Sequence, residues 1–274
     1  MKSIPLKSVQ LADGRKMSFL HHVCEKENAP TIVFAHGFPL DHSMWLGQLP
    51  LVEYASLLMP DLPGFGQSEP AVGDVSMQSM SDDVAGLLEQ LQIPKVIFCG
   101  LSMGGYIGWR FVADHGEMLA GLICCNTRAE ADDETTARAR GVAAAQVLKT
   151  GAEPVAETMR QKLFSESTLK EQPQVVDAVV GIIVNTSVAT IAATQRAMSR
   201  RPDSSSLLSG IDVPTLVIAG TEDLITPARG MEDMALQIPE STLVTIKDAG
   251  HLSPMESPEV FNLSLSHWLA GLFR

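Results

Sequence analysis

Residues 100–104, Gly-Leu-Ser-Met-Gly, have the types and spacing needed for nucleophilic chemistry at Ser102. They follow a short apolar run, residues 96–99, and precede a helix-like stretch over residues 106–112. A serine at such a sharp strand-to-helix turn projects its hydroxyl clear of a sheet, and the flanking glycines avoid a collision where strand and helix converge. The free N–H groups at the helix start add a partial positive charge beside the hydroxyl. We therefore expect a nucleophile at Ser102 if a base and an acid accompany it.

An aspartate and a histidine follow Ser102 at the ends of two later predicted strands. Asp223 lies in Gly-Thr-Glu-Asp-Leu-Ile-Thr-Pro, residues 220–227, and His251 lies in Ala-Gly-His-Leu-Ser-Pro, residues 249–254. A nucleophilic serine needs a base that takes its proton and a carboxylate that orients this base. We expect His251 to be the base and Asp223 the acid. The carboxylates that compete with Asp223 for this role are those of Asp212, Glu222 and Asp248.

A second loop could supply an oxyanion hole. Residues 36–39, His-Gly-Phe-Pro, end an apolar run near the N-terminus. If this run lies beside the serine strand, the amide N–H of Phe38 comes next to Ser102. Together with the amide N–H of Met103, it would provide two donors for the negative charge that develops on a carbonyl oxygen under attack.

The elements that must position these groups are short strands that alternate with helices. Continuous apolar runs are typical of strands buried on both faces of a parallel sheet. They occupy residues 31–35, 55–59, 96–99, 119–125, 215–219 and 242–246. Helices are predicted over residues 43–54, from 79 or 81 to 91, and over 103–115, 227–237 and 257–272. With a pair of short strands within residues 3–23, this order predicts an α/β fold whose mostly parallel central sheet is flanked by helices.

The alternation breaks over residues 130–208, where the periodicity is helical and no strand is evident. Helices are predicted over residues 131–150, 153–164, 174–184 and 188–198. We expect a core domain made of residues 1–129 and 209–274, with residues 130–208 forming a helical cap inserted after the strand at 119–125. Such a cap would lie over the carboxyl ends of the strands, where open α/β sheets bind ligands.

In these motifs the sequence resembles the α/β-hydrolase family. The matching segments are residues 36–39, 100–105, 220–227 and 249–254, together with Asp-Leu-Pro-Gly-Phe-Gly-Gln-Ser at 61–68. The resemblance implies the α/β-hydrolase fold, with Ser102 as nucleophile, His251 as base and Asp223 as acid. It gives the loop at 61–68 a structural role. Within the family, the sequence resembles the branch that holds 3-oxoadipate enol-lactonase-like hydrolases, small-molecule esterases and cofactor-free perhydrolases.

Substrate contacts are predicted at Trp45 and Arg128. Trp45 and Met103 neighbour the two oxyanion segments and could line an apolar pocket. Arg128 follows the strand at 119–125, and its guanidinium could bind a substrate carboxylate through two hydrogen bonds. The alternative for Arg128 is an arginine that anchors its own loop. If Arg128 and a cap arginine such as Arg138 or Arg160 face the pocket, an acidic enol-lactone is favoured as the substrate.

The composition limits which binding partners and cofactors we expect. The formal net charge of −12 argues against nucleic acid or an anionic membrane surface. The four cysteines lack metal-site spacing, and neither a phosphate-binding loop nor a dinucleotide fingerprint is present, so no cofactor or metal is expected. No signal peptide or membrane span is evident, and we expect the cysteine thiols to be buried and reduced. These features predict a cytoplasmic protein.

These observations predict a cofactor-independent serine hydrolase that acts on a small carboxylic ester or lactone. Two alternatives use the same residues: 3-oxoadipate enol-lactone hydrolysis, and perhydrolase or haloperoxidase activity, in which peroxide captures the acyl group. A non-catalytic binding module on the same fold is disfavoured, because a nucleophile, a base and an acid are all present.

Overall fold

The computed structural model describes residues 4–71 and 73–272, and within them it contains one eight-stranded sheet. The strand order is β1-β2-β4-β3-β5-β6-β7-β8. β1 pairs with β2, and β2 with β4, in antiparallel register, whereas the strands from β4 to β8 run parallel. The strands are β1 (Lys7–Gln10), β2 (Lys16–His22), β3 (Thr31–Ala35), β4 (Ser56–Pro60), β5 (Val96–Leu101), β6 (Leu119–Cys125), β7 (Thr215–Gly220) and β8 (Ser241–Ile246).

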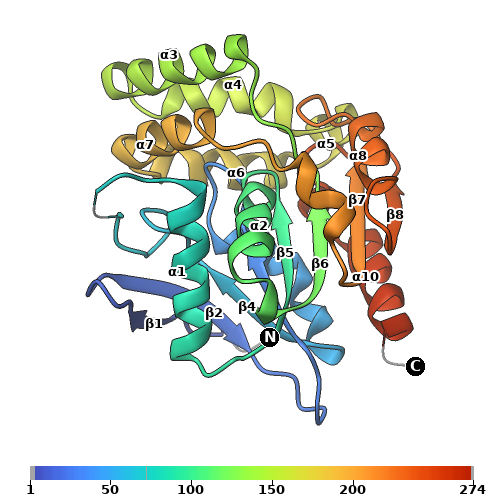
Figure 1. Ribbon diagram of the computed structural model, residues 1–274. Helices are drawn as coiled ribbons and strands as arrows, with labels where there is room; N and C mark the ends of the chain where they lie inside the picture. The colour runs from blue at the N-terminus through green and yellow to red at the C-terminus, as the bar shows by residue number, and fades with distance from the viewer. Residues whose placement is uncertain (1–3, 72, 273–274) are drawn as a thin grey trace.

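Helices cover both faces of this sheet (Figure 1). Side chains that alternate along each central strand enter two separate apolar cores: in β3, Val33 faces the first core, whereas Ile32 and Phe34 face the second. The first core is closed by α1 (Met77–Gln90), α2 (Met103–Asp114) and α8 (Ala228–Ala235). The second is closed by η1 (His42–Glu53) and α10 (Pro258–Leu272). Burial on both faces explains why the strands read as unbroken apolar runs and confirms the predicted α/β architecture.

Local chemistry moves the start of one predicted helix and changes the type of another. Helix α1 begins earlier than predicted, because Ser76 caps it and forms a reciprocal pair of hydrogen bonds with Ser79. The segment predicted as a helix over 43–54 is a 3₁₀ helix, η1, which contains Pro50. Proline removes one donor from an α-helical ladder, so this segment takes the tighter form. Short 3₁₀ turns also occur at η2 (Gly116–Met118) and η3 (Ser205–Gly210).

A group of helices lies between β6 and β7 in the chain. It comprises α3 (Glu134–Thr150), α4 (Glu153–Leu163), α5 (Glu166–Glu171), α6 (Pro173–Asn185) and α7 (Val188–Ser199). Figure 1 shows this helical insertion above the carboxyl ends of the parallel strands. Within it α3 packs on α7, and α4 packs on α6. Helix α5 is absent from the sequence prediction, because six residues are too few to show helical periodicity. The division into a core and a cap domain at residues 130 and 208 stays a prediction.

Among the described residues, no single helix is long and apolar enough to cross a membrane. Helices α6 and α7 meet the length and composition criterion only as a pair, and their axes bend by 96° where they join.

The structure corrects the prediction that Trp45 lines a substrate pocket. The Trp45 side chain is fully buried in the second core, and it packs against Phe34 and Phe261 with ring centroids 5.1 and 6.2 Å away. A large aromatic side chain next to a motif has two ways to bury its surface, and here η1 turns it into the sheet-facing core. Trp45 is therefore a core residue and not a substrate contact.

Replacing Trp45 with alanine is expected to lower the free energy of unfolding by about 3–5 kcal/mol, because it leaves a cavity in a packed core. Trp45→Phe keeps an aromatic ring and should cost less. Urea denaturation followed by circular dichroism measures both. The control is Leu236→Ala, at a side chain that is 86 % exposed, which should change stability by no more than about 0.5 kcal/mol. Equal losses for Trp45→Ala and Leu236→Ala would contradict the core assignment.

Candidate active site

Ser102 lies at the junction of β5 and α2 in a backbone conformation that residues other than glycine rarely adopt, with φ of +53° and ψ of −112°. Two hydrogen bonds hold this turn: the Ser102 N–H donates to the Cys125 carbonyl at 3.0 Å, and the Ser102 carbonyl accepts from the Thr127 hydroxyl at 2.8 Å. The flanking glycines are required by space. A Cβ at Gly100 would lie 2.3 Å from the Gly104 carbonyl oxygen, and one at Gly104 would lie 2.1 Å from that of Ala35.

The loop at 36–39 lies beside the serine. A Cβ built at Gly37 would come within 3.7 Å of Ser102 Cβ. His36 fixes this loop from the buried side: its Nε2 accepts from the Leu62 N–H at 3.0 Å, so its Nδ1 must carry the proton and donate to the Gly37 carbonyl, also at 3.0 Å. Among the loop and turn hydrogen bonds of residues 4–71 and 73–272, the backbone N–H groups of Phe38 and Met103 donate to no carbonyl. Both remain available as a pair of donors.

His251 and Asp223 are in direct contact. The His251 Nδ1 lies 2.8 Å from Asp223 Oδ2, and both side chains are buried. Of the three competing carboxylates, Glu222 accepts a hydrogen bond from the Glu166 N–H, while Asp212 and Asp248 are exposed residues. Among the described residues, Asp223 alone pairs with His251 through a carboxylate.

Four further donors fix the Asp223 carboxylate. Oδ1 accepts from the N–H groups of Ile225 at 2.7 Å and Thr226 at 2.9 Å. Oδ2 accepts from the Thr226 hydroxyl at 2.6 Å and from Asn126 Nδ2 at 2.8 Å. Burial alone would raise the pKa of this carboxyl, but His251 and the Thr226 donors outweigh burial and lower the pKa to about 2. Asp223 therefore stays ionised and holds the His251 Nδ1 proton in place.

Sequence analysis missed Asn126 and Thr226. Asn126 follows the last residue of β6 and is buried with φ of +43°, and its Oδ1 accepts from the Ser253 hydroxyl at 2.7 Å. The signal that could have found it is its place at the carboxyl end of a central strand, the same signal that singled out Ser102 and Asp223.

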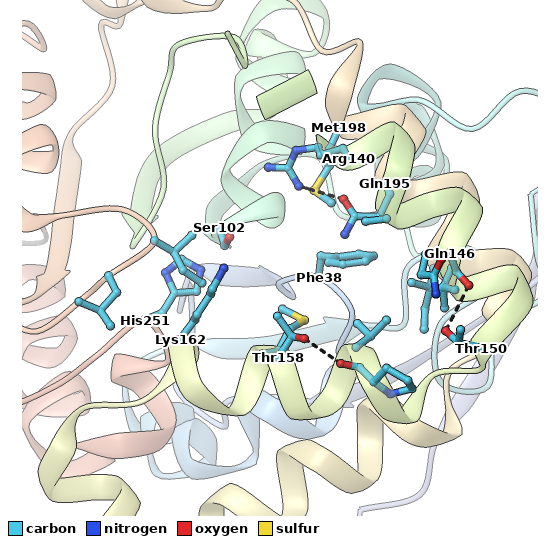
Figure 2. A pocket seen from close by; sticks show the side chains of 18 of the residues that line it. Phe38, Ser102, Arg140, Gln146, Thr150, Thr158, Lys162, Gln195, Met198 and His251 are labelled. Atoms are coloured by element: carbon cyan, nitrogen blue, oxygen red, sulfur yellow. Dashed lines mark hydrogen bonds between the residues drawn. The ribbon is translucent and has the colours of Figure 1, made fainter. Parts of the chain in front are cut away.

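A cavity of about 620 Å³ opens onto Ser102 and His251, within the range of about 300–1,000 Å³ usual for small-molecule sites. Its other walls come mostly from the helical insertion (Figure 2). The remaining lining residues are Phe38, Tyr106, Arg140, Ala143, Gln146, Val147, Thr150, Pro154, Val155, Thr158, Met159, Lys162, Ile191, Gln195, Met198, Leu224 and Ile225.

The structure places Arg128 and the Met103 side chain outside this lining. The Arg128 guanidinium donates to the Ile225 carbonyl, and its own carbonyl accepts from the Trp109 indole N–H at 2.8 Å. Arg128 therefore ties the loop after β6 to the loop that carries Asp223, which corrects its prediction as a substrate contact. The Met103 side chain is buried in the first core. Of the two cap arginines, Arg138 pairs with Glu134 on the surface, and Arg160 is exposed away from the cavity.

The loop at 61–68 has the structural role that the resemblance implied. Asp61 accepts from the His42 and Gln67 N–H groups, both at 2.9 Å, and its Oδ1 lies 2.6 Å from the His42 ring. Asp41, His42 and Asp61 form the one group of metal-type ligands found among the described residues. The Asp41 side chain accepts a hydrogen bond from the Ser43 N–H as the N-cap of η1. Hydrogen bonds within the protein therefore already account for the arrangement.

Comparison with known proteins identifies the family. A family model described as alpha/beta hydrolase fold matches residues 30–258. The chain is 30 % identical over 234 residues to 3-oxoadipate enol-lactonase 2 of Acinetobacter baylyi, which covers 85 % of this chain and 86 % of that protein.

The chain belongs to the α/β-hydrolase family.

Solved structures agree with this assignment. A thermophilic esterase from Thermogutta terrifontis, with malate bound, is similar with a TM-score of 0.93 and 36 % identity over 98 % of this chain and 100 % of that one. The enol-lactonase from Burkholderia xenovorans is similar with a TM-score of 0.88 and 28 % identity over 96 % and 100 % of the two chains. The predicted resemblance is thereby confirmed: this α/β hydrolase falls in the enol-lactonase-like branch.

The lowered pKa of Asp223 predicts how its contribution to stability varies with pH. Because this pKa falls from 3.8 to about 2 on folding, the ionised carboxylate stabilises the fold by about 2 kcal/mol. That stabilisation is complete above about pH 5 and disappears as the pH falls through about 2. The difference in unfolding free energy between the wild type and Asp223→Asn, measured in urea, should therefore shrink by about 2 kcal/mol between those two pH values. A constant difference would contradict the assignment.

Proposed function

We propose that this α/β hydrolase is a serine hydrolase that cleaves small carboxylic esters or lactones through an acyl-enzyme. The observation that carries the proposal is the 2.8 Å contact between His251 Nδ1 and the buried Asp223 carboxylate, with His251 and Ser102 lining one cavity. A buried, ionised carboxylate on Nδ1 leaves Nε2 as the basic nitrogen of the ring.

Acylation follows from this arrangement. The Ser102 hydroxyl attacks the substrate carbonyl carbon while His251 Nε2 takes the hydroxyl proton. The amide N–H groups of Phe38 and Met103 donate to the oxygen that becomes negative. When the tetrahedral intermediate collapses, the carbon–oxygen bond to the leaving group breaks, and His251 returns the proton to that oxygen.

Deacylation repeats these events with water. His251 takes a proton from water, the resulting hydroxide attacks the acyl carbon, and the bond to Ser102 Oγ breaks as the proton returns to the serine. An ester yields an acid and an alcohol in two separate departures. A lactone yields a single hydroxy acid, and an enol-lactone yields an enol that tautomerises to a keto acid, because the leaving oxygen stays tethered to the acyl chain.

Enol-lactone hydrolysis is the second candidate, and similarity to two relatives favours it. Both 3-oxoadipate enol-lactonases of Acinetobacter baylyi are 30 % identical to this chain, over 85 % and 93 % of its length. Turnover of an enol-lactone beside that of a simple ester separates the two candidates, since a general esterase would show no preference for the lactone.

Ser102→Ala is expected to reduce turnover of a 4-nitrophenyl ester by several orders of magnitude, because no other group takes over the covalent step. A fluorophosphonate probe should label the wild type at Ser102 alone, as found by peptide mass spectrometry. The thermal unfolding midpoint provides the control for folding. Wild-type turnover in Ser102→Ala, or labelling at another serine, would refute the proposed nucleophile.

Asp223→Asn should lower kcat by roughly 10⁴-fold, because an asparagine favours the wrong tautomer of the imidazole. The matched control is Asp248→Asn, which removes a carboxylate from the exposed turn before His251. It should leave kcat within a few-fold of the wild type. Steady-state hydrolysis of the same ester measures both, and a larger loss in Asp248→Asn would reverse the assignment of the acid.

A further inference from the structure

The charged groups on the cavity wall are all positive. Arg140 and Lys162 line the cavity, and no aspartate or glutamate does so among the residues that the structure describes. The protein as a whole has a formal net charge of −12, so this local excess runs against its overall charge. In Figure 2, Arg140 lies beside Gln195 and Met198 on one wall, whereas Lys162 lies near His251.

Arg140 belongs to a cluster with one carboxylate and two guanidinium groups. Asp132 Oδ2 lies 2.5 Å from Arg140 Nε, and Asp132 Oδ1 lies 2.7 Å from Arg201 Nη1. The side chains of Asp132 and Arg201 are only 2 % and 3 % exposed, while that of Arg140 is 21 % exposed. Among the described residues, Asp132 is thus the one carboxylate within salt-bridge distance of these two cations, and an excess of positive charge remains at the pair. The exposed Asp203 interacts with Arg201 only from a greater distance.

The two arginines differ in what remains free. Arg201 also donates to the carbonyls of Met198 and Glu130, and it lies over the Tyr106 ring at 4.0 Å from its centroid. Both outer nitrogens of Arg201 are therefore occupied within the protein, while its Nε is buried and has no hydrogen-bond partner among the described residues. The other contacts of Arg140 are weaker, with Nη1 at 3.2 Å from Gln195 Oε1 and 3.6 Å from the Met198 sulfur.

The outer nitrogen of Arg140 is available for a ligand. Its Nη2 donates to no group within residues 4–71 and 73–272. Gln195 uses its oxygen to accept from Arg140, which leaves its Nε2 group as a donor. A guanidinium presents a planar fork of N–H groups that matches the two oxygens of a carboxylate. A carboxylate placed there would also neutralise the surplus charge.

We propose that Arg140, together with Gln195, binds a carboxylate carried by the substrate, so that the preferred substrates are anionic esters or lactones. This inference rests on the proposed function, because it concerns the same cavity. Asp132 and Arg201 act through Arg140 as positioning residues, since they fix its guanidinium against the wall formed by α3 and α7. Lys162, an exposed residue at the cavity, adds a second positive charge that attracts the anion.

The wild-type enzyme provides the first test. The probes are the mono-4-nitrophenyl ester of adipic acid and its neutral analogue, 4-nitrophenyl 5-carbamoylpentanoate, which replaces the carboxylate with an amide of the same shape. We expect kcat/KM for the acid to exceed that for the amide by at least about tenfold, the ratio that a single charged contact readily supplies. A ratio of one or less would overturn the proposal, whatever the variants do.

Variants then assign the preference to Arg140. In Arg140→Gln the acid-to-amide ratio of kcat/KM should fall by at least about tenfold, mainly through a higher KM for the acid. Arg140→Lys keeps the charge but not the fork and should cause a smaller fall. Gln195→Met, which leaves both ion pairs of Asp132 intact, should lower the ratio by a few-fold and serves as the second variant if Arg140→Gln does not fold.

The matched control is Arg138→Gln. It removes the same charge from the same helix at a side chain that is 71 % exposed and paired with Glu134. This variant should keep the wild-type ratio. Equal ratios in Arg138→Gln and Arg140→Gln would overturn the role of Arg140. Hydrolysis of both probes by Ser102 without any preference would refute the carboxylate site alone, whereas hydrolysis that persists in Ser102→Ala would refute the proposed function itself.

Discussion

The backbone of Ser102 imposes the constraint on which the rest of the site depends. Its φ of +53° turns the chain from β5 into α2 within one residue and is a costly conformation for a residue with a side chain. The fold holds it with the Cys125 carbonyl and the Thr127 hydroxyl, which belong to the end of β6 and the loop after it. The neighbouring strand is therefore what holds Ser102 in this conformation, and the turn is stable only while β5 and β6 are paired.

That dependence explains why so much of the site gathers at one edge of the sheet. β6 leads into Asn126, which donates to Asp223 in the loop after β7. Asp223 contacts His251 in the loop after β8. Parallel register places these three loops side by side, and each bond between them fixes the next. Arg128 extends the same chain of contacts, because it joins the loop after β6 to Ile225 beside Asp223.

The sequence alone predicted those parts of the fold and the site that depend on short-range chemistry. Apolar runs located the central strands, and the glycines around Ser102 located its turn. The pocket wall was harder, because a side chain's direction on a helix depends on its rotation about the axis. Arg138 and Arg140 differ by two positions, which is about 200° around an α-helix, so one is a surface residue and the other reaches the cavity. The prediction for Trp45 was wrong for a related reason, since apolar side chains on either side of η1 look alike in sequence.

The helical insertion also holds the site together, beyond forming the wall of the cavity. The Leu163 carbonyl at the end of α4 accepts from the His251 N–H at 2.9 Å, and the Ser165 N–H donates to Glu256 at 2.8 Å. A Cβ on Gly250 would lie 2.6 Å from the Ser165 nitrogen, so the insertion presses directly on the histidine loop. Thr186, which follows α6, donates to the Pro39 carbonyl in the loop beside Ser102 at 3.2 Å. Substitutions that remodel the cavity wall therefore also affect the position of His251 and of the loop at 36–39. Substrate preference and turnover should change together unless a substitution leaves these contacts intact. Substitutions of Arg140 on α3 and of Gln195 on α7 do so, because neither residue takes part in them.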